Sequence, residues 1–145
     1  MIKPFEFYLE NNLGRKEIPN ISLVKSLTEK AEIRLARILK TGVSEEKEAS
    51  IVFEDAYEIV REASQAIMEL KGYKPYSHEA LISFLKGGSY LDEAMINVLN
   101  SYRILMDNSV YRAEKISLEK CKEAIDFAKD ALPVIIRVVK NMMIK

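Results

Sequence analysis

The feature that most constrains the fold is a helical period of apolar residues that returns in one segment after another. Apolar side chains recur at spacings of three and four, which places them along one face of an α-helix. No segment alternates with a period of two for long enough to predict a strand. The sequence therefore predicts an all-α fold, an up-down antiparallel bundle of five to six helices. The expected helices cover 21–40, 45–71, 90–112 and 118–143, with shorter ones at 4–14 and 78–86.

The length of 145 residues favours a single helical domain. We expect residues 1–20 to form an N-terminal extension and residues 21–145 to form the bundle. Four serines stand where a helix could begin, and each hydroxyl can cap a first turn: Ser44, Ser77, Ser89 and Ser117. The apolar stripes predict a core that includes Val52, Phe53, Ile59, Val60, Met95, Val98, Leu99, Leu105 and Ile125.

The composition excludes several classes of function. Cys121 and His78 are the only residues of their kinds, so a disulfide within the chain, a Cys-rich zinc site and a His-pair metal motif are excluded. No glycine-rich phosphate loop is present, and we expect neither a metal nor a cofactor. No signal peptide and no uncharged apolar run of about 18 residues appears, which predicts a cytoplasmic protein without a membrane partner.

Charge and hydropathy are distributed unevenly among the expected helices. The 22 basic and 22 acidic side chains balance overall, yet residues 21–40 carry a net +3 and residues 44–71 a net −5. Antiparallel neighbours of opposite sign would complement each other. After Pro133 the last helix is apolar nearly all round. It needs a second partner, which is either the apolar N-terminal segment or another subunit, and we expect a homodimer.

A polar stripe on the fifth expected helix is the leading candidate site. Asn100, Arg103, Asp107 and Tyr111 are spaced i, i+3, i+7 and i+11, and Asn108 lies beside them. One interpretation is a solvated face with an i, i+4 ion pair. The other is a cleft in which Arg103 binds phosphate and Tyr111 stacks on a base or bonds a nucleotide.

The linker before residue 78 is a secondary candidate. Lys74, Tyr76 and His78 combine positive charge, an aromatic ring and the single imidazole of the chain. Such residues can contact the phosphates and bases of a nucleic acid. The alternative is that the linker folds over one end of the bundle and its rings cover the core.

Two stretches of the chain resemble a known family. The turn "KGYKPYSH" matches a pattern carried here by Lys71, Gly72, Pro75, Ser77 and His78, and the segment "SYRILMDNSVYRAEKIS" precedes the last helix. Their order is similar to that of the HEPN domain superfamily, especially its small stand-alone archaeal and bacterial members. The resemblance covers roughly residues 22–140.

The resemblance implies a helical bundle that usually homodimerises. Many members are metal-independent ribonucleases or toxins, and several are paired with a small nucleotidyltransferase that acts as antitoxin. Their nuclease motif is Arg, then four to six residues, then His. Here an alignment on Arg103 places Ser109 at the His, and the other register places Met106 at the Arg and Tyr111 at the His.

Neither register supplies an imidazole, and the side chain of Tyr titrates near 10. The sequence therefore predicts a non-catalytic HEPN-like protein that binds RNA, a nucleotide or a protein partner such as a nucleotidyltransferase. One alternative is a metal-independent endoribonuclease with a variant site of Arg103, Asp107, Asn108 and Tyr111. The other alternative is a structural adaptor that binds another protein through its C-terminal helix.

Overall fold

The expected all-α bundle is confirmed. The computed structural model describes residues 1–112 and 114–144, and the side chains of these residues except 110–112. Within that part of the chain six α-helices and two very short strands occur. The elements are α1 (Phe5–Glu10), β1 (Gly14–Lys16), α2 (Ile21–Thr41), a 3₁₀ turn η1 (Glu46–Glu48), α3 (Ala49–Leu70), β2 (Tyr73–Pro75), α4 (His78–Gly87), α5 (Glu93–Arg112) and α6 (Leu118–Ile144).

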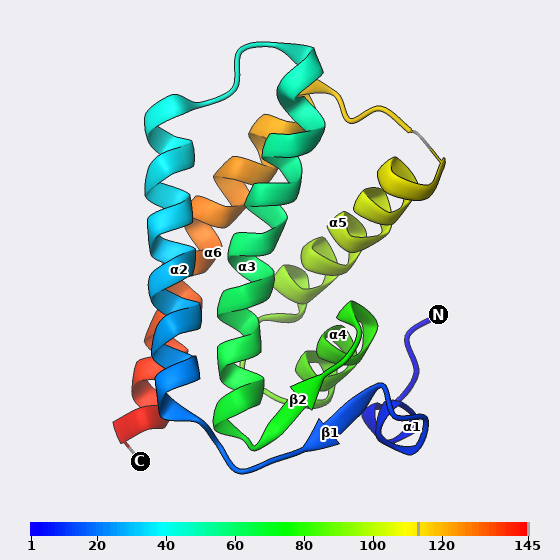
Figure 1. The fold of residues 1–145 in the computed structure, drawn as a ribbon, viewed down its shortest axis with the longest axis vertical. Helices are drawn as coiled ribbons and strands as arrows, with labels where there is room; N and C mark the ends of the chain where they lie inside the picture. The colour runs from blue at the N-terminus through cyan, green and yellow to red at the C-terminus, as the bar shows by residue number, and fades with distance from the viewer. Residues whose placement is uncertain (113, 145) are drawn as a thin grey trace.

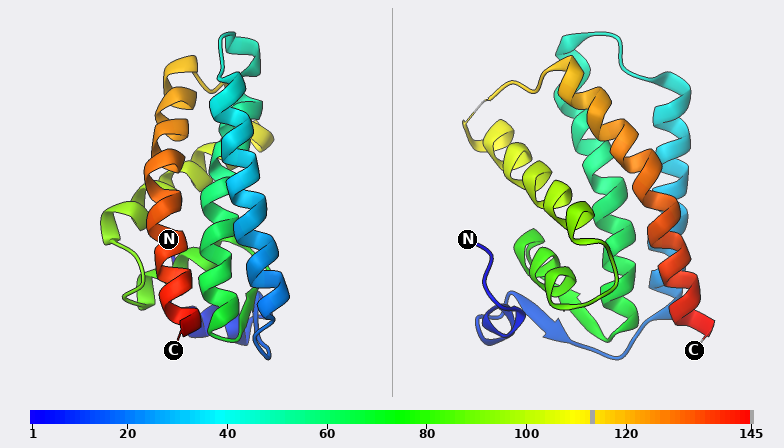
Figure 2. Two further views of the ribbon diagram at one scale, coloured as in Figure 1. Left: turned by 90° about the vertical axis from the view of Figure 1, so that its left-hand side faces the viewer. Right: turned by 180° about the vertical axis from the view of Figure 1, so that it is seen from behind.

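Helix α3 is the centre of the bundle. It packs along its length against α2 on one side and α6 on another, and it also contacts α4, α5 and β2. Figure 1 shows α2, α3 and α6 running alongside one another, with α5 crossing at an angle and α4 below it. The views of Figure 2 show the same arrangement from the side and from behind. This central position explains why α3 carries more buried residues than its neighbours.

The opposite charges of α2 and α3 meet as expected. Glu62 of α3 is 5% exposed, and one of its carboxylate oxygens lies 3.1 Å from the guanidinium of Arg34 on α2. Lys30 approaches the other oxygen at 3.9 Å. A carboxylate this deeply buried needs a charged partner, and α2 supplies it through Arg34 and Lys30.

A small antiparallel ribbon is present where no strand was expected. Gly14 pairs with Pro75 and Lys16 with Tyr73. Three residues are too few to show an alternating pattern in the sequence. Each strand forms only because it pairs with a distant segment of the chain. The N-terminal segment is thereby folded against α4, and the ring of Phe5 packs edge-on against Tyr73 at 5.3 Å. It does not cover the last helix, which was one of the two partners we expected.

Two of the four predicted serine caps are present and two predictions are wrong. Ser77 and Ser117 accept hydrogen bonds from N–H groups three residues later, at 3.1 and 3.0 Å. Ser44 is not a cap, because the turn η1 follows it and α3 begins only at Ala49. Ser89 is not a cap either, because α5 begins at Glu93.

Five of the nine residues predicted for the core are buried, and the other four are only partly buried. Phe53, Ile59, Val60, Leu99 and Ile125 are buried. The remaining four are only partly buried and pack against the margin of the core: Val52, Met95, Val98 and Leu105. Among the described helices, none combines the length and the apolar character that crossing a bilayer requires.

Candidate functional site

The imidazole of His78 is held at the start of α4 by a side chain of the central helix. Ser77 has extended backbone, and its Oγ accepts a hydrogen bond from the N–H of Ala80, which fixes where α4 begins. His78 is the first residue of that helix, and its Nδ1 lies 3.0 Å from Oη of Tyr57 on α3. Because Tyr57 is only 1% exposed, the bundle core sets the position of the imidazole.

The guanidinium of Arg103 reaches from α5 toward the same end of α4. Nε donates to Oδ1 of Asn100 at 3.0 Å. One terminal nitrogen lies 3.4 Å from Oε1 of Glu79 and 3.5 Å from Oδ2 of Asp107. These two contacts are at the long limit of hydrogen bonding, and each carboxylate side chain is 47% exposed. The charge of Arg103 is thus loosely compensated on the solvent side.

His78 lines two small hollows, and an arginine side chain also lines each of them. The Arg103 hollow has a volume of about 250 Å³ and is lined by Leu13, Ser77, His78, Glu79, Arg103 and Asp107. The Arg61 hollow has a volume of about 220 Å³ and is lined by Arg61, Gln65, Pro75, Tyr76, Ser77, His78 and Leu81. In each of the two hollows, a guanidinium group thus lines the same surface as the imidazole of His78.

Arg61 is more firmly paired than Arg103. Its Nε and one terminal nitrogen donate to the two carboxylate oxygens of Glu58 at 2.8 and 2.5 Å, a bidentate arrangement. The other terminal nitrogen donates to Oε1 of Gln65 at 3.1 Å. Burial disfavours the charged form of Glu58, but the bond from Arg61 holds the pKa of that carboxyl below its usual value. Of the two guanidiniums, Arg103 is therefore the one freer to accept a new anion.

The surroundings keep His78 neutral near pH 7. Burial lowers the pKa of His78 from its ordinary 6.5, and the charges of Arg61 and Arg103 lower it further. The carboxylates of Glu58 and Asp107 act in the opposite direction without reversing the shift. Burial also raises the pKa of Tyr57 well above its usual range, so its hydroxyl stays protonated. A neutral imidazole beside a guanidinium can exchange a proton with a bound group while the cation holds its charge.

The structure gathers part of the predicted stripe and separates the rest. Asn100, Arg103 and Asp107 lie together in hydrogen-bonding reach. Asn108 is on the same helix but does not line either hollow. The side chain of Tyr111 lies outside the described residues. Arg103 is 9% exposed, because α4 packs against α5 and covers the stripe that we expected to face away from the apolar side.

The secondary candidates are likewise divided. His78 joins both hollows, and Tyr76, which is half exposed, lines the Arg61 hollow. Lys74 lies on β2 opposite Arg15 and lines neither hollow.

Sequence reasoning did not identify three residues of this site, which are Tyr57, Arg61 and Glu79. The first two lie four residues apart on one helix and therefore share a face, which is the one signal that could have identified them. Glu79 also accepts a hydrogen bond from Oη of the buried Tyr8 at 3.3 Å, which ties α1 to the site.

The site has no arrangement of ligands for a metal ion. Among the residues that the structure describes, no group of three or more His, Cys, Asp and Glu side chains could hold one. What the site can offer is two guanidiniums, a neutral imidazole, a half-exposed aromatic ring and three carboxylates. A comparison of the chain with protein-family models, with curated proteins and with solved structures finds no match.

Proposed function

We propose that this protein binds single-stranded RNA, with a backbone phosphate in the Arg103 hollow. The observation that carries the proposal is that a neutral imidazole and a guanidinium, which come from two different helices, line the same hollow. Guanidinium groups recognise phosphate through two parallel hydrogen bonds, and a neutral imidazole can donate a third. The resemblance of the sequence to HEPN proteins, many of which act on RNA, supports the same choice.

Binding requires Arg103 to exchange partners. Its contacts to Glu79 and Asp107 are both long and both carboxylates stay half exposed to water, so a phosphate oxygen can replace one carboxylate while the guanidinium keeps an anionic partner. The partly buried bond from Nε to Asn100 can remain and keep the guanidinium in place. The nearby carboxylates also lower the affinity, and we expect weak binding that salt reduces further.

Tyr76 gives the site a surface for a base. The ring is half exposed and lines the Arg61 hollow, which shares His78 with the Arg103 hollow. Aromatic rings stack on bases without sequence preference and contribute about 1–3 kcal/mol per base. An RNA strand with a phosphate in the Arg103 hollow and a base at the Arg61 hollow would pass over the imidazole of His78, which lines both hollows. This arrangement favours a flexible single strand over a duplex.

Metal-independent cleavage of RNA is the second candidate function, and the neutrality of His78 favours it. In that reaction the ribose 2′-hydroxyl attacks the adjacent phosphorus and its proton passes to a base, while the bond from phosphorus to the 5′-oxygen breaks and this oxygen takes up a proton from water. The products are a 2′,3′-cyclic phosphate and a 5′-hydroxyl. His78 can accept the first proton, and Arg103 can stabilise the additional negative charge on the phosphoryl oxygens. The missing imidazole of the sequence motif would then come from α4 rather than α5.

One experiment tests binding and another tests cleavage. Anisotropy of labelled single-stranded RNA should show roughly 10- to 100-fold weaker binding for Arg103→Ala, since a hydrogen bond to a charged group contributes about 1.5–3 kcal/mol. Arg37→Ala is the matched control, because Arg37 is an exposed arginine on α2, away from α4 and α5. Equal affinities for the two variants would contradict the proposal.

The second experiment separates the two candidate functions. Wild-type protein and His78→Asn are incubated with the RNA in excess chelator, and the 3′ ends are examined for cyclic phosphate. Cleavage by wild type that the variant lacks would establish the ribonuclease. Binding without cleavage in both would leave a non-catalytic RNA-binding protein. Binding of a mononucleotide as tightly as RNA would instead indicate a nucleotide site.

A further inference from the structure

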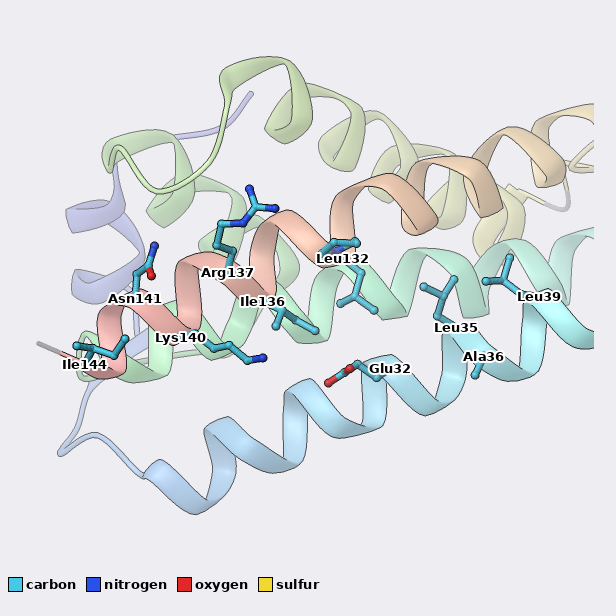
Figure 3. A pocket seen from close by; sticks show the side chains of 11 residues that line it. Glu32, Leu35, Ala36, Leu39, Leu132, Ile136, Arg137, Lys140, Asn141 and Ile144 are labelled. Carbon is cyan, nitrogen blue, oxygen red and sulfur yellow. The ribbon is translucent and has the colours of Figure 1, made fainter.

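An apolar groove runs between α2 and α6, on the other side of α3 from the Arg103 hollow. Its volume is about 750 Å³. Figure 3 shows Leu35 and Leu39 along one wall and Leu132 and Ile136 along the other. The full lining is Glu32, Leu35, Ala36, Leu39, Leu132, Pro133, Ile136, Arg137, Lys140, Asn141 and Ile144. The groove is therefore mostly apolar, with a few charged residues on its walls.

The apolar residues of the groove are arranged as in a helix-packing surface. Leu35 and Leu39 are four residues apart on α2, and Leu132 and Ile136 have the same spacing on α6, so each pair forms a stripe on one helix face. Leu39 is 48% and Ile144 is 83% exposed. Stripes with this spacing normally pack against a further helix. Leu132 is buried, and Leu35 and Ile136 are partly buried against the core, so Leu39 and Ile144 are the large apolar side chains that the groove exposes.

The charges on the two walls have opposite sign. Glu32 extends from α2, whereas Arg137 and Lys140 belong to α6, and Figure 3 places Glu32 and Lys140 on opposite sides of the groove. In the part of the chain that the structure describes, none of the three forms an ion pair. A surface with one acidic and one basic wall is complementary to a copy of itself when the walls are exchanged.

We propose that a second copy of this chain packs on the groove about a two-fold axis that runs along it. Each α2 then lies against α6 of the other copy. Glu32 of each copy faces the basic wall of the other, and this contact occurs twice, as in any isologous interface. Leu39 and Ile144 lose their exposure to water in both copies. The interface is a four-helix layer in which every apolar stripe is covered.

The size of this surface is sufficient for a dimer. α2 has 21 residues, which at 1.5 Å per residue makes a helix about 31 Å long. Two helices at an interaxial distance of 8–10 Å present a face roughly 20 Å wide, so each copy would cover about 600 Å², or about 1,200 Å² in total. That total lies at the lower limit of stable interfaces, where the charge pairs would influence the affinity measurably.

Charge reversal tests the proposal. Glu32→Lys and Lys140→Glu each turn the two attractive contacts of the dimer into repulsive ones. Both positions are exposed, so the fold should be retained, and circular dichroism and thermal unfolding check this. By sedimentation velocity we expect wild-type protein to dimerise at about 50 µM, and each variant to dimerise at least about tenfold more weakly. Lys86→Glu, an exposed change on α4, which lies on the other side of α3 from the groove, is the matched control and should dimerise like wild type.

Mixing the two variants gives the decisive result. In a heterodimer of Glu32→Lys and Lys140→Glu both contacts become attractive again, so the equimolar mixture should recover dimerisation. An effect confined to one copy could not be rescued in this way. A monomeric wild type, single variants that dimerise as well as wild type, or a mixture that stays monomeric would each overturn the proposal. RNA binding at Arg103 is not required for any of these outcomes.

Discussion

Replacing His78 should remove the pH dependence of stability in the mildly acidic range. The sign follows from its environment, because burial lowers the pKa of His78 below the 6.5 of the unfolded chain. As the pH falls through 6.5, the unfolded chain takes up a proton before the folded protein does. The free energy of unfolding therefore decreases from about pH 7 downward, until the lowered pKa of the folded state is passed.

The magnitude has a strict upper limit because the chain contains one histidine. One proton bound by the unfolded state alone changes the free energy of unfolding by about 1.4 kcal/mol per pH unit. Other perturbed groups act in different ranges. The lowered pKa values of Glu58 and Glu123 affect stability mainly below about pH 5, and the raised pKa of Tyr57 acts only in the alkaline range. Between about pH 5 and 7 the slope should come from His78.

The assay is urea unfolding at constant ionic strength, followed by circular dichroism between about pH 5 and 8. His78→Asn is the suitable variant, because the Asn amide can lie near the position of Nδ1, keep the bond to Tyr57 and not titrate. Wild type should lose stability toward low pH while His78→Asn stays flat. A slope that survives in His78→Asn, or one clearly steeper than 1.4 kcal/mol per pH unit, would refute the assignment of a buried neutral imidazole.

Two further predictions concern the fold. Leu99 is 1% exposed, so Leu99→Ala should cost about 2–5 kcal/mol in urea unfolding, and a loss below 1 kcal/mol would mean that this part of the core can collapse around the cavity. Gly72 has φ +81°, and an added Cβ would lie 2.7 Å from the carbonyl oxygen of Glu17. Gly42 has φ +62° but open space around it, so Gly42→Ala should lower the free energy of unfolding by only about 1–2 kcal/mol. Gly72→Ala should therefore lower it by more than Gly42→Ala does.

The sequence was informative wherever a local rule operates. The spacing of apolar residues determined that the chain is helical and where most helices lie, because burial of one stripe per helix is a requirement of any bundle. Ser77 and Ser117 were identified as caps because a cap acts on its own first turn. Ser44 and Ser89 offered the same local signal, and there the chain forms a 3₁₀ turn or a loop before the helix starts. Helix ends are decided partly by how the connection must reach the next helix.

The candidate site was recognised only in part for a similar reason. The spacing of Asn100, Arg103 and Asp107 places them on one face, whatever the fold. Their burial depends on α4, which packs on that face, and Glu79 contacts Arg103 across 24 residues of sequence. The motif comparison sought an imidazole on the same helix as the arginine. The imidazole that shares the hollow comes from His78 on another helix, so no spacing rule along one helix could reveal it.

The sequence by itself determined the helical class, the apolar face of each helix and the polar face that carries Arg103. Only the tertiary structure decided which faces meet. It placed α3 at the centre, folded the first residues onto α4 through a three-residue ribbon, and left the apolar groove between α2 and α6 open. The physical reason is that the helical period determines only which side chains share a face of one helix. Which other helix packs against that face depends on how all the helices pack around one core.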